Sequence, residues 1–251
     1  MATFTGSDDL RGTEFLDADL TGARFVGADL SGVVMRGVQV EAADIDAPWL
    51  SEGGFLRVNG VDVIPFVEAE LDRRFPGRAT RRAGEPEGLR VAWAALEGAW
   101  ASTLERVAVM PSGAVDVSVA GEWSFAQTLR HLVHATDMWL GRAVLEIEEP
   151  FHPLGLADTG PDADSVEDPA VTAVEPSFGE VLEAREGRVA MVRDFLADVT
   201  AEELAAARKN PHDPDEEETT LSCLHVILEE EWEHMRFALR DLDSIDAESG
   251  G

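Results

Sequence analysis

Hydrophobic residues follow two different periods along this chain. Over the first 50 residues an apolar side chain recurs at every fifth position, namely at Leu10, Phe15, Leu20, Phe25, Leu30, Met35, Val40, Ile45 and Leu50. A five-residue period fits neither the 3.6-residue period of a helix nor the two-residue period of a strand. The chain is therefore expected to turn repeatedly in this segment and to bury every fifth side chain along one axis.

Beyond residue 54 the apolar spacing is that of amphipathic helices. A short helix is expected over residues 63–75, followed by four longer ones over 87–108, 124–145, 177–199 and 219–243. Three of the longer helices open with a Ser or Thr that can act as an N-cap. Four helices of these lengths predict a four-helix bundle, and the proline-rich connection 146–176 is expected to cross one of its ends.

Two of these helices carry side chains that suit a metal site. Glu230 and His234 are four residues apart on the last helix, so they share one face and can contact the same ion. His131 stands at the margin of the apolar face of the second long helix and can supply a third ligand. Three protein ligands with one open position are typical of a catalytic metal site. A solvated charged face is the alternative, because the chain has 50 acidic residues and such pairs occur by chance.

Other side chains near this group have weaker cases. Glu231 falls within the apolar stripe of the last helix, where a carboxylate needs a partner, and it is a candidate for supporting the ligands. His152, in the loop FHPLGL, is a candidate for contacting a substrate or for acid–base chemistry, and a purely structural role is an equal alternative. Cys223 is expected to be a buried, inert thiol.

The five-residue units at the start, such as ADLTG, ARFVG and ADLSG, resemble the pentapeptide-repeat family over about residues 8–50. The resemblance implies a right-handed, four-sided β-helix with four units per coil. Nine units make little more than two coils, which need neighbours to cap their open ends. The expected domains are this β-helix over 1–54, a helical linker over 55–87, the four-helix bundle over 88–245 and a disordered tail over 246–251.

Three runs in the second part are similar to the DinB-like superfamily: the W-S-x-x-x-x-L-x-H-L spacing from Trp123, the loop FHPLGL, and EEEWEHMRFALRDL. They extend over about residues 85–243. Many members bind a divalent metal through three histidines, and the mycothiol-dependent maleylpyruvate isomerases use a His, Glu, His set around zinc. The resemblance implies that His131, Glu230 and His234 bind Zn²⁺, with Ni²⁺, Fe²⁺ and Mn²⁺ as alternatives. The expected fold class is mainly α with a small β part.

The same resemblance implies a metal-dependent transferase or isomerase. Such an enzyme activates a low-molecular-weight thiol, here mycothiol, as a thiolate for S-transfer to an electrophilic small molecule or for its isomerisation. The sequence leaves open whether the chain is catalytic. The alternative is a non-catalytic, acidic pentapeptide-repeat protein that binds a partner and uses the helices as a metal-stabilised scaffold.

The composition excludes several classes of binding partner. The formal net charge is -30, so the surface repels nucleic acid and anionic membranes. A single cysteine permits no intrachain disulfide, and neither a signal segment nor an apolar stretch near 20 residues is recognisable. A cytoplasmic location is therefore expected. The expected partners are a small-molecule thiol and an electrophile, with homodimer formation left open.

Overall fold

The computed structural model describes residues 3–157 and 176–249. The chain divides into two compact units, and the first ends at Asp46, eight residues before the boundary expected from the sequence. Among the described residues, the first unit comprises residues 3–46 and the second comprises residues 47–157 and 176–249. No helix in these ranges combines the length and the apolar composition needed to cross a bilayer.

The first unit is a succession of turns with a five-residue period. The N–H of Thr13 donates to Leu10 O at 3.1 Å, and the same bond recurs ten and twenty residues later. Gly12 adopts a φ of 71°, and positive φ values recur at every fifth residue up to Ala42. A turn whose third residue has positive φ favours glycine, which explains the small residues at these corners. The repeated turning predicted from the five-residue period is present.

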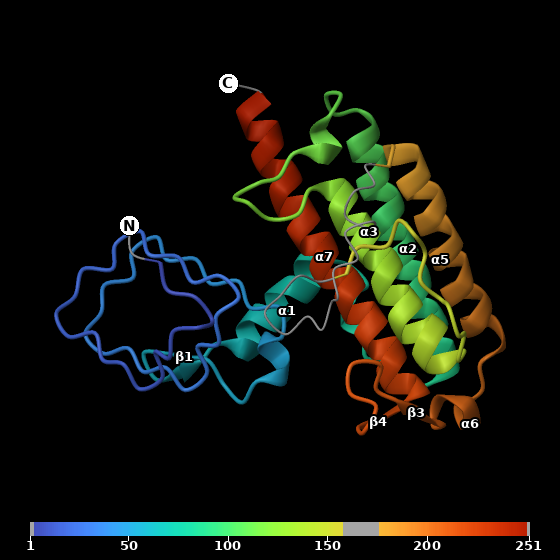
Figure 1. The fold of residues 1–251 in the computed structure, drawn as a ribbon, viewed down its shortest axis with the longest axis horizontal. Coiled ribbons are helices and arrows are strands. Elements are labelled where there is room, and N and C mark those ends of the chain that lie inside the picture. Colours follow the sequence, from blue (N-terminus) through green and yellow to red (C-terminus); the bar gives the residue numbers. More distant parts are fainter. Residues whose placement is uncertain (1–2, 158–175, 250–251) are drawn as a thin grey trace. The chain divides into compact units, whose positions relative to one another are not determined.

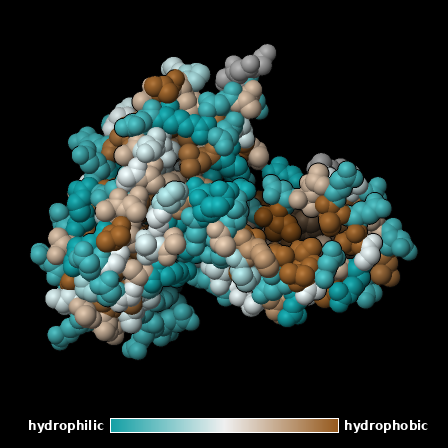
Figure 2. Space-filling view, turned by 180° about the vertical axis from the view of Figure 1, so that it is seen from behind, coloured by the Kyte–Doolittle hydropathy of each residue, from teal (hydrophilic) through white to brown (hydrophobic). Residues whose placement is uncertain are grey.

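The β-helix expected for this unit is not confirmed. Residues 3–46 carry no assigned strand, and the side chains at every fifth position are exposed, from 41% for Leu10 to 64% for Ile45. In Figure 1 the trace of this unit makes wide coils, and in Figure 2 its hydrophobic side chains gather around a hollow. Burial requires that apolar atoms reach one another across the interior. The expected burial of every fifth residue is therefore not observed.

The second unit begins with small elements. The 3-10 helix η1 (Leu50–Glu52) precedes the antiparallel strands β1 (Arg57–Val58) and β2 (Val61–Asp62). Asn59 and Gly60 between them both have positive φ, as a tight hairpin turn requires. The helix α1 (Ile64–Arg74) confirms the short helix expected over 63–75, and η2 (Arg78–Thr80) follows it. Residues 55–87 were expected to form a linker, but they belong to the same compact unit as the longer helices.

The long helices stand side by side in Figure 1 and confirm the four expected from the sequence. Their bounds are α2 (Pro86–Ala108), α3 (Phe125–Thr136) continued by the π-helix η4 (Asp137–Val144), α5 (Phe178–Asp198) and α7 (Thr220–Ser249). Short elements complete the unit: η3 (Ala114–Asp116), α6 (Ala201–Leu204) and the antiparallel pair β3 (Ala207–Lys209) and β4 (Glu217–Thr219). Residues 246–249 continue α7, although a disordered tail was expected there.

Local sequence explains where the long helices begin. The Ser124 side chain accepts from the N–H of Gln127, whose own side chain returns a bond to the N–H of Ser124, and Ser177 does the same with Glu180. Glu85 caps α2 by accepting from the N–H groups of two following residues. Such caps satisfy amide groups that have no partner within the helix.

The apolar faces of these helices meet in one core. Its largest fully buried apolar side chains come from three of the long helices and include Leu89, Leu96, Leu129, Leu132, Leu140, Ile227, Trp232, Met235 and Leu242. The connection after η4 is described only as far as Ala157, so most of its expected path across the bundle lies outside the described residues.

Candidate metal centre

Three side chains that the sequence singles out meet between α3 and α7. His131 comes from α3, and Glu230 and His234 come from consecutive turns of α7. Their candidate ligand atoms all lie within 4.8 Å of one another, and no other group of three or more such residues is found in the described ranges. His131 Nε2 is 3.3 Å from Glu230 Oε2, and the two imidazole rings stack with centroids 4.6 Å apart. We call these three residues the HEH group.

Backbone carbonyl groups orient both histidines. His131 Nδ1 is 3.1 Å from Leu156 O, and His234 Nδ1 is 2.8 Å from Glu230 O. A carbonyl oxygen can only accept, so each Nδ1 donates in this arrangement, and Nε2 is the ring nitrogen through which each histidine could contact an ion. Metal-binding histidines in proteins are commonly held in this way by a bond to the other ring nitrogen. His234 Nδ1 also lies 3.2 Å from Glu230 Oε2, so the group is linked internally.

The donor set fits a small divalent ion. Tetrahedral zinc with bonds of about 2.0–2.1 Å places its ligand atoms about 3.3 Å apart. The separation of His131 Nε2 and Glu230 Oε2 already equals this value, and the remaining separations stay within 4.8 Å. A closing movement of about 1–2 Å would therefore complete a three-ligand site.

The charge state of the group also suits a cation. Burial alone would raise the pKa of Glu230, but hydrogen bonds from His131 and His234 outweigh burial and hold this pKa at about 2. Glu230 is therefore a carboxylate at neutral pH. Burial would lower the pKa of His234, yet its bond to the Glu230 carboxylate raises this pKa overall. A proton on His234 would compete with a metal ion, so metal binding should weaken as the pH falls.

Aromatic rings border the HEH group. The ring of Trp123 is centred 4.7 Å from that of His131 and 6.1 Å from that of His234. Phe237 meets His234 edge-on at 5.8 Å, and the Arg236 guanidinium lies 4.5 Å from the Phe237 ring centre. The side chains of Glu230 and His234 nevertheless remain 17% and 15% exposed. The group is therefore partly open to solvent beside these rings.

The acidic residues beside Glu230 have other partners. Both carboxylate oxygens of Glu231 lie 2.5 Å from Arg185 Nη2, and one accepts a 2.7 Å bond from the indole N–H of Trp100. Glu231 was a candidate for supporting the metal ligands, but its hydrogen bonds go to α5 and α2 instead. The reason is helical rotation, because one residue turns the side chain by about 100° away from Glu230.

Glu229 and Glu233 are likewise buried and paired. Arg81 Nε donates to Glu229 Oε2 at 2.9 Å, and Arg236 Nη2 donates to Glu233 Oε2 at 2.8 Å. Burial raises the pKa of Glu233, and Arg236 and Arg78 offset part of this effect. Of the four glutamates on this turn of α7, only Glu230 is bonded to histidines and partly open to solvent.

A network of hydrogen bonds, which sequence reasoning missed, holds the loop that contacts His131. Asp137, the first residue of η4, is buried and accepts from Arg188 Nε at 2.7 Å and from the His152 N–H at 2.8 Å. Arg130 Nε donates to Leu154 O at 2.9 Å. These bonds position the loop that presents Leu156 O to His131. A π-helix often marks a functional site, but the helical pattern of this segment contains no signal for it.

The remaining candidates have local roles. His152 Nδ1 accepts from the Leu154 N–H at 3.2 Å, and burial lowers the pKa of His152, so its ring braces the loop. The His134 ring stacks on Phe151 rather than on the HEH group. Cys223 is fully buried, and burial raises its pKa to about 12, which agrees with the expected inert thiol.

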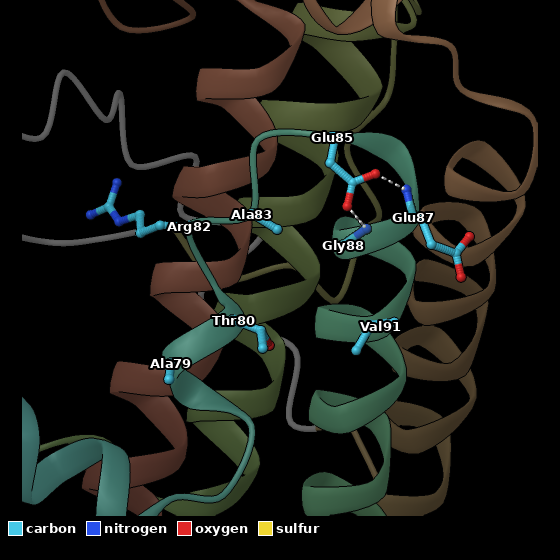
Figure 3. A pocket seen from close by; sticks show the side chains of 8 residues that line it. All are labelled: Ala79, Thr80, Arg82, Ala83, Glu85, Glu87, Gly88 and Val91. Atoms are coloured by element: carbon cyan, nitrogen blue, oxygen red, sulfur yellow. Dashed lines mark hydrogen bonds between the residues drawn. The ribbon is translucent and has the colours of Figure 1, made fainter.

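A separate cavity of about 390 Å³ lies at the start of α2 (Figure 3). Its walls include Ala79, Thr80, Arg82, Ala83, Gly88 and Val91. Glu85 points toward the first turn of α2, where it caps Glu87 and Gly88, as Figure 3 shows. None of the HEH residues borders this cavity, so it is not part of the candidate metal centre.

Comparison with known families supports the assignment of both parts of the chain. The model of the DinB superfamily matches residues 95–238, and the model of pentapeptide repeats matches eight copies over residues 2–37. Neither the curated proteins nor the solved structures yield a match. The DinB match extends over more than half of the chain and includes all three HEH residues. The chain therefore belongs to the DinB superfamily.

Proposed function

We propose that this protein is a metal-dependent enzyme that activates a low-molecular-weight thiol. The observation that supports it best is the HEH group itself, with three ligand atoms within 4.8 Å and both histidines oriented through Nδ1. His131, Glu230 and His234 would hold the ion, Zn²⁺ in the first instance, with Ni²⁺, Fe²⁺ or Mn²⁺ as alternatives. A bound divalent ion with one open position would lower the pKa of a thiol so that it is held as the thiolate.

The residues around the site suit this chemistry. Two neutral imidazoles and one carboxylate leave a divalent ion with a single net positive charge, which favours an anionic fourth ligand such as a thiolate. Trp123 and Phe237 exclude water from one side and offer an apolar surface to the carbon skeleton of a substrate. Mycothiol as the thiol, and S-transfer to or isomerisation of an electrophile as the reaction, follow from resemblance to superfamily enzymes.

Metal content is the first test. Untagged protein, loaded with Zn²⁺ and then desalted, should carry close to one ion per chain by inductively coupled plasma mass spectrometry. His131→Ala and Glu230→Ala should each lose the ion while staying folded. His225→Ala is a matched control on α7, since its ring bonds to Ala83 O away from the group. If the wild-type protein retains no ion after incubation with Zn²⁺, Ni²⁺ or Fe²⁺, the proposal is wrong.

A second candidate is a non-catalytic interaction protein. It is favoured by one observation, the run of exposed apolar side chains in the pentapeptide unit. Thiol binding separates the two candidates. Co²⁺-loaded protein should develop a sulfur-to-metal charge-transfer band with a thiol if the enzyme proposal holds. A cobalt-loaded protein that binds none of a panel of thiols would leave the interaction protein as the better account.

A further inference from the structure

Trp123 packs beside both histidines of the HEH group. Its ring is centred 4.7 Å from that of His131, on α3, and 6.1 Å from that of His234, on α7. The centroids of the two imidazole rings are 4.6 Å apart, so the three rings form a compact triangle. A close-packed neighbour restricts the rotation of a side chain, because the side chain cannot turn without displacing it. The Trp123 ring therefore limits the movement of both imidazoles.

Local hydrogen bonds fix the main chain on each side of Trp123. Before it, the Glu122 N–H donates to Val119 O at 3.0 Å, and Ser118 Oγ donates to Glu122 O. After it, Ser124 forms the capping box at the start of α3. The position of the indole ring beside α3 is thus determined by short-range structure.

An ion pair joins the same segment to α7. Arg240 Nη2 donates to Glu122, the neighbour of Trp123, and the Arg240 guanidinium lies 5.4 Å from the Phe237 ring centre. Phe237 in turn meets His234 edge-on at 5.8 Å. The side chains of Arg240 and Glu122 are 36% and 49% exposed, so this pair makes a modest contribution. It nevertheless connects the segment of Trp123 to the helix that carries two of the three candidate ligands.

We propose that Trp123 is a positioning residue for the metal centre and holds the His131 and His234 rings in the arrangement that binds an ion. The inference rests on the proposed function, because it requires that the HEH group binds a metal. Ligand atoms that lie within 4.8 Å of one another must approach to about 3.3 Å in a tetrahedral site. Small rotations of the two rings therefore decide whether the ligand atoms converge.

Zinc affinity, measured by competition with a chromogenic chelator, is the first test. Trp123→Ala should bind Zn²⁺ at least about tenfold more weakly than wild type, as is usual when a residue that supports metal ligands is removed. Trp123→Phe keeps an aromatic ring beside both histidines and should restore most of the affinity. Trp49→Ala is the control, because Trp49 precedes η1 and is 44% exposed. Wild-type affinity in Trp123→Ala overturns the assignment.

NMR of the carbon-bound histidine ring protons gives a second test, in metal-free protein. The His131 and His234 rings are close enough for a nuclear Overhauser effect between them, and His131→Ala and His234→Ala identify their signals among those of the six histidines. The effect should weaken in Trp123→Ala and persist in Trp123→Phe. An undiminished effect in Trp123→Ala contradicts the positioning role, because the rings then keep their places without the tryptophan.

A milder variant keeps the test decisive if Trp123→Ala does not fold. Glu122→Ala removes a half-exposed side chain and releases the segment of Trp123 from Arg240. Its zinc affinity should fall by up to about fivefold, and the effect between the two histidine rings should weaken. If neither changes, the assignment is overturned. Failure of wild type to bind any ion would count against the proposed function, whereas the metal-free NMR comparison would still decide whether Trp123 holds the two rings.

Discussion

Both units of this molecule have periodic apolar sequences, yet only one buries them. In the helical unit Leu132 is 1% exposed, whereas in the pentapeptide unit Phe25 is 61% exposed. In both units the period is realised locally, as a helix face or as a series of corners. Burial needs something more, namely a second apolar surface within contact distance. The four helices present such surfaces to one another, while the coils of the first unit enclose a hollow (Figure 2).

The sharpest way to probe the helical unit is to break its most buried ion pair. Arg185→Ala would leave the Glu231 carboxylate buried without its cation, and we expect unfolding to become easier by about 3–5 kcal/mol. Arg193→Ala, which removes an exposed pair with Glu97, should cost less than about 1 kcal/mol. Urea unfolding followed by circular dichroism gives both values. Equal effects would mean that the buried pair contributes nothing beyond a surface contact.

The comparison of the units can be tested directly with one truncation in each. Leu132→Ala removes a side chain from the core and should destabilise the protein by about 2–5 kcal/mol. Phe25→Ala removes a side chain that is mostly in solvent and should cost less than about 1 kcal/mol. If thermal unfolding shows similar losses for the two variants, the pentapeptide unit has a core and the contrast is wrong.

Acidification tests the charge of the HEH group in the metal-free protein. Because the pKa of Glu230 is about 2 in the folded state, below its usual value near 4.3, its contribution is present above pH 4.3 and is lost as the pH falls through about 2. The contribution is on the order of 3 kcal/mol. The free energy of unfolding of wild type exceeds that of Glu230→Gln by this amount at pH 6. Measured in urea, the difference should decrease as the pH is lowered to 2.

Asp29→Asn is a suitable control for this series. Its pKa is also lowered, by bonds to Ser31, but Asp29 is fully exposed in the pentapeptide unit. The difference between wild type and this variant should stay small over the whole pH range. A pH-independent effect of Glu230→Gln would show that the carboxylate is not stabilised by its histidines.

The smallest effect concerns a helix start. Ser124→Ala removes the cap of α3 and should cost about 1 kcal/mol. Because the cap lies next to Trp123, whose ring is centred 4.7 Å from that of His131, the fluorescence of Trp123 should change as well. Ser102→Ala, on the exposed face of α2, is the control and should change neither stability nor fluorescence. Loss of stability in both variants alike would argue against a capping role.

Sequence reasoning located the long helices to within one or two residues at their starts because capping is local. Ser124 and Ser177 act on amide groups three residues ahead, so no distant part of the chain is needed. It also paired Glu230 with His234, since four residues on a helix return to the same face. The end of α7 was placed too early, because no stop signal precedes Ser249 that a pattern could detect.

The sequence by itself thus determined the long helices, the corners of the pentapeptide unit and the three residues of the HEH group. Only the tertiary structure decided which partner each neighbouring carboxylate bonds, because each partner is an arginine or a histidine from another element. Glu229 meets Arg81, Glu231 meets Arg185, and Glu230 meets His131, although the three glutamates are adjacent and identical in type. Rotation about the helix axis separates them by about 100° each, and packing then assigns the partner that lies in each direction.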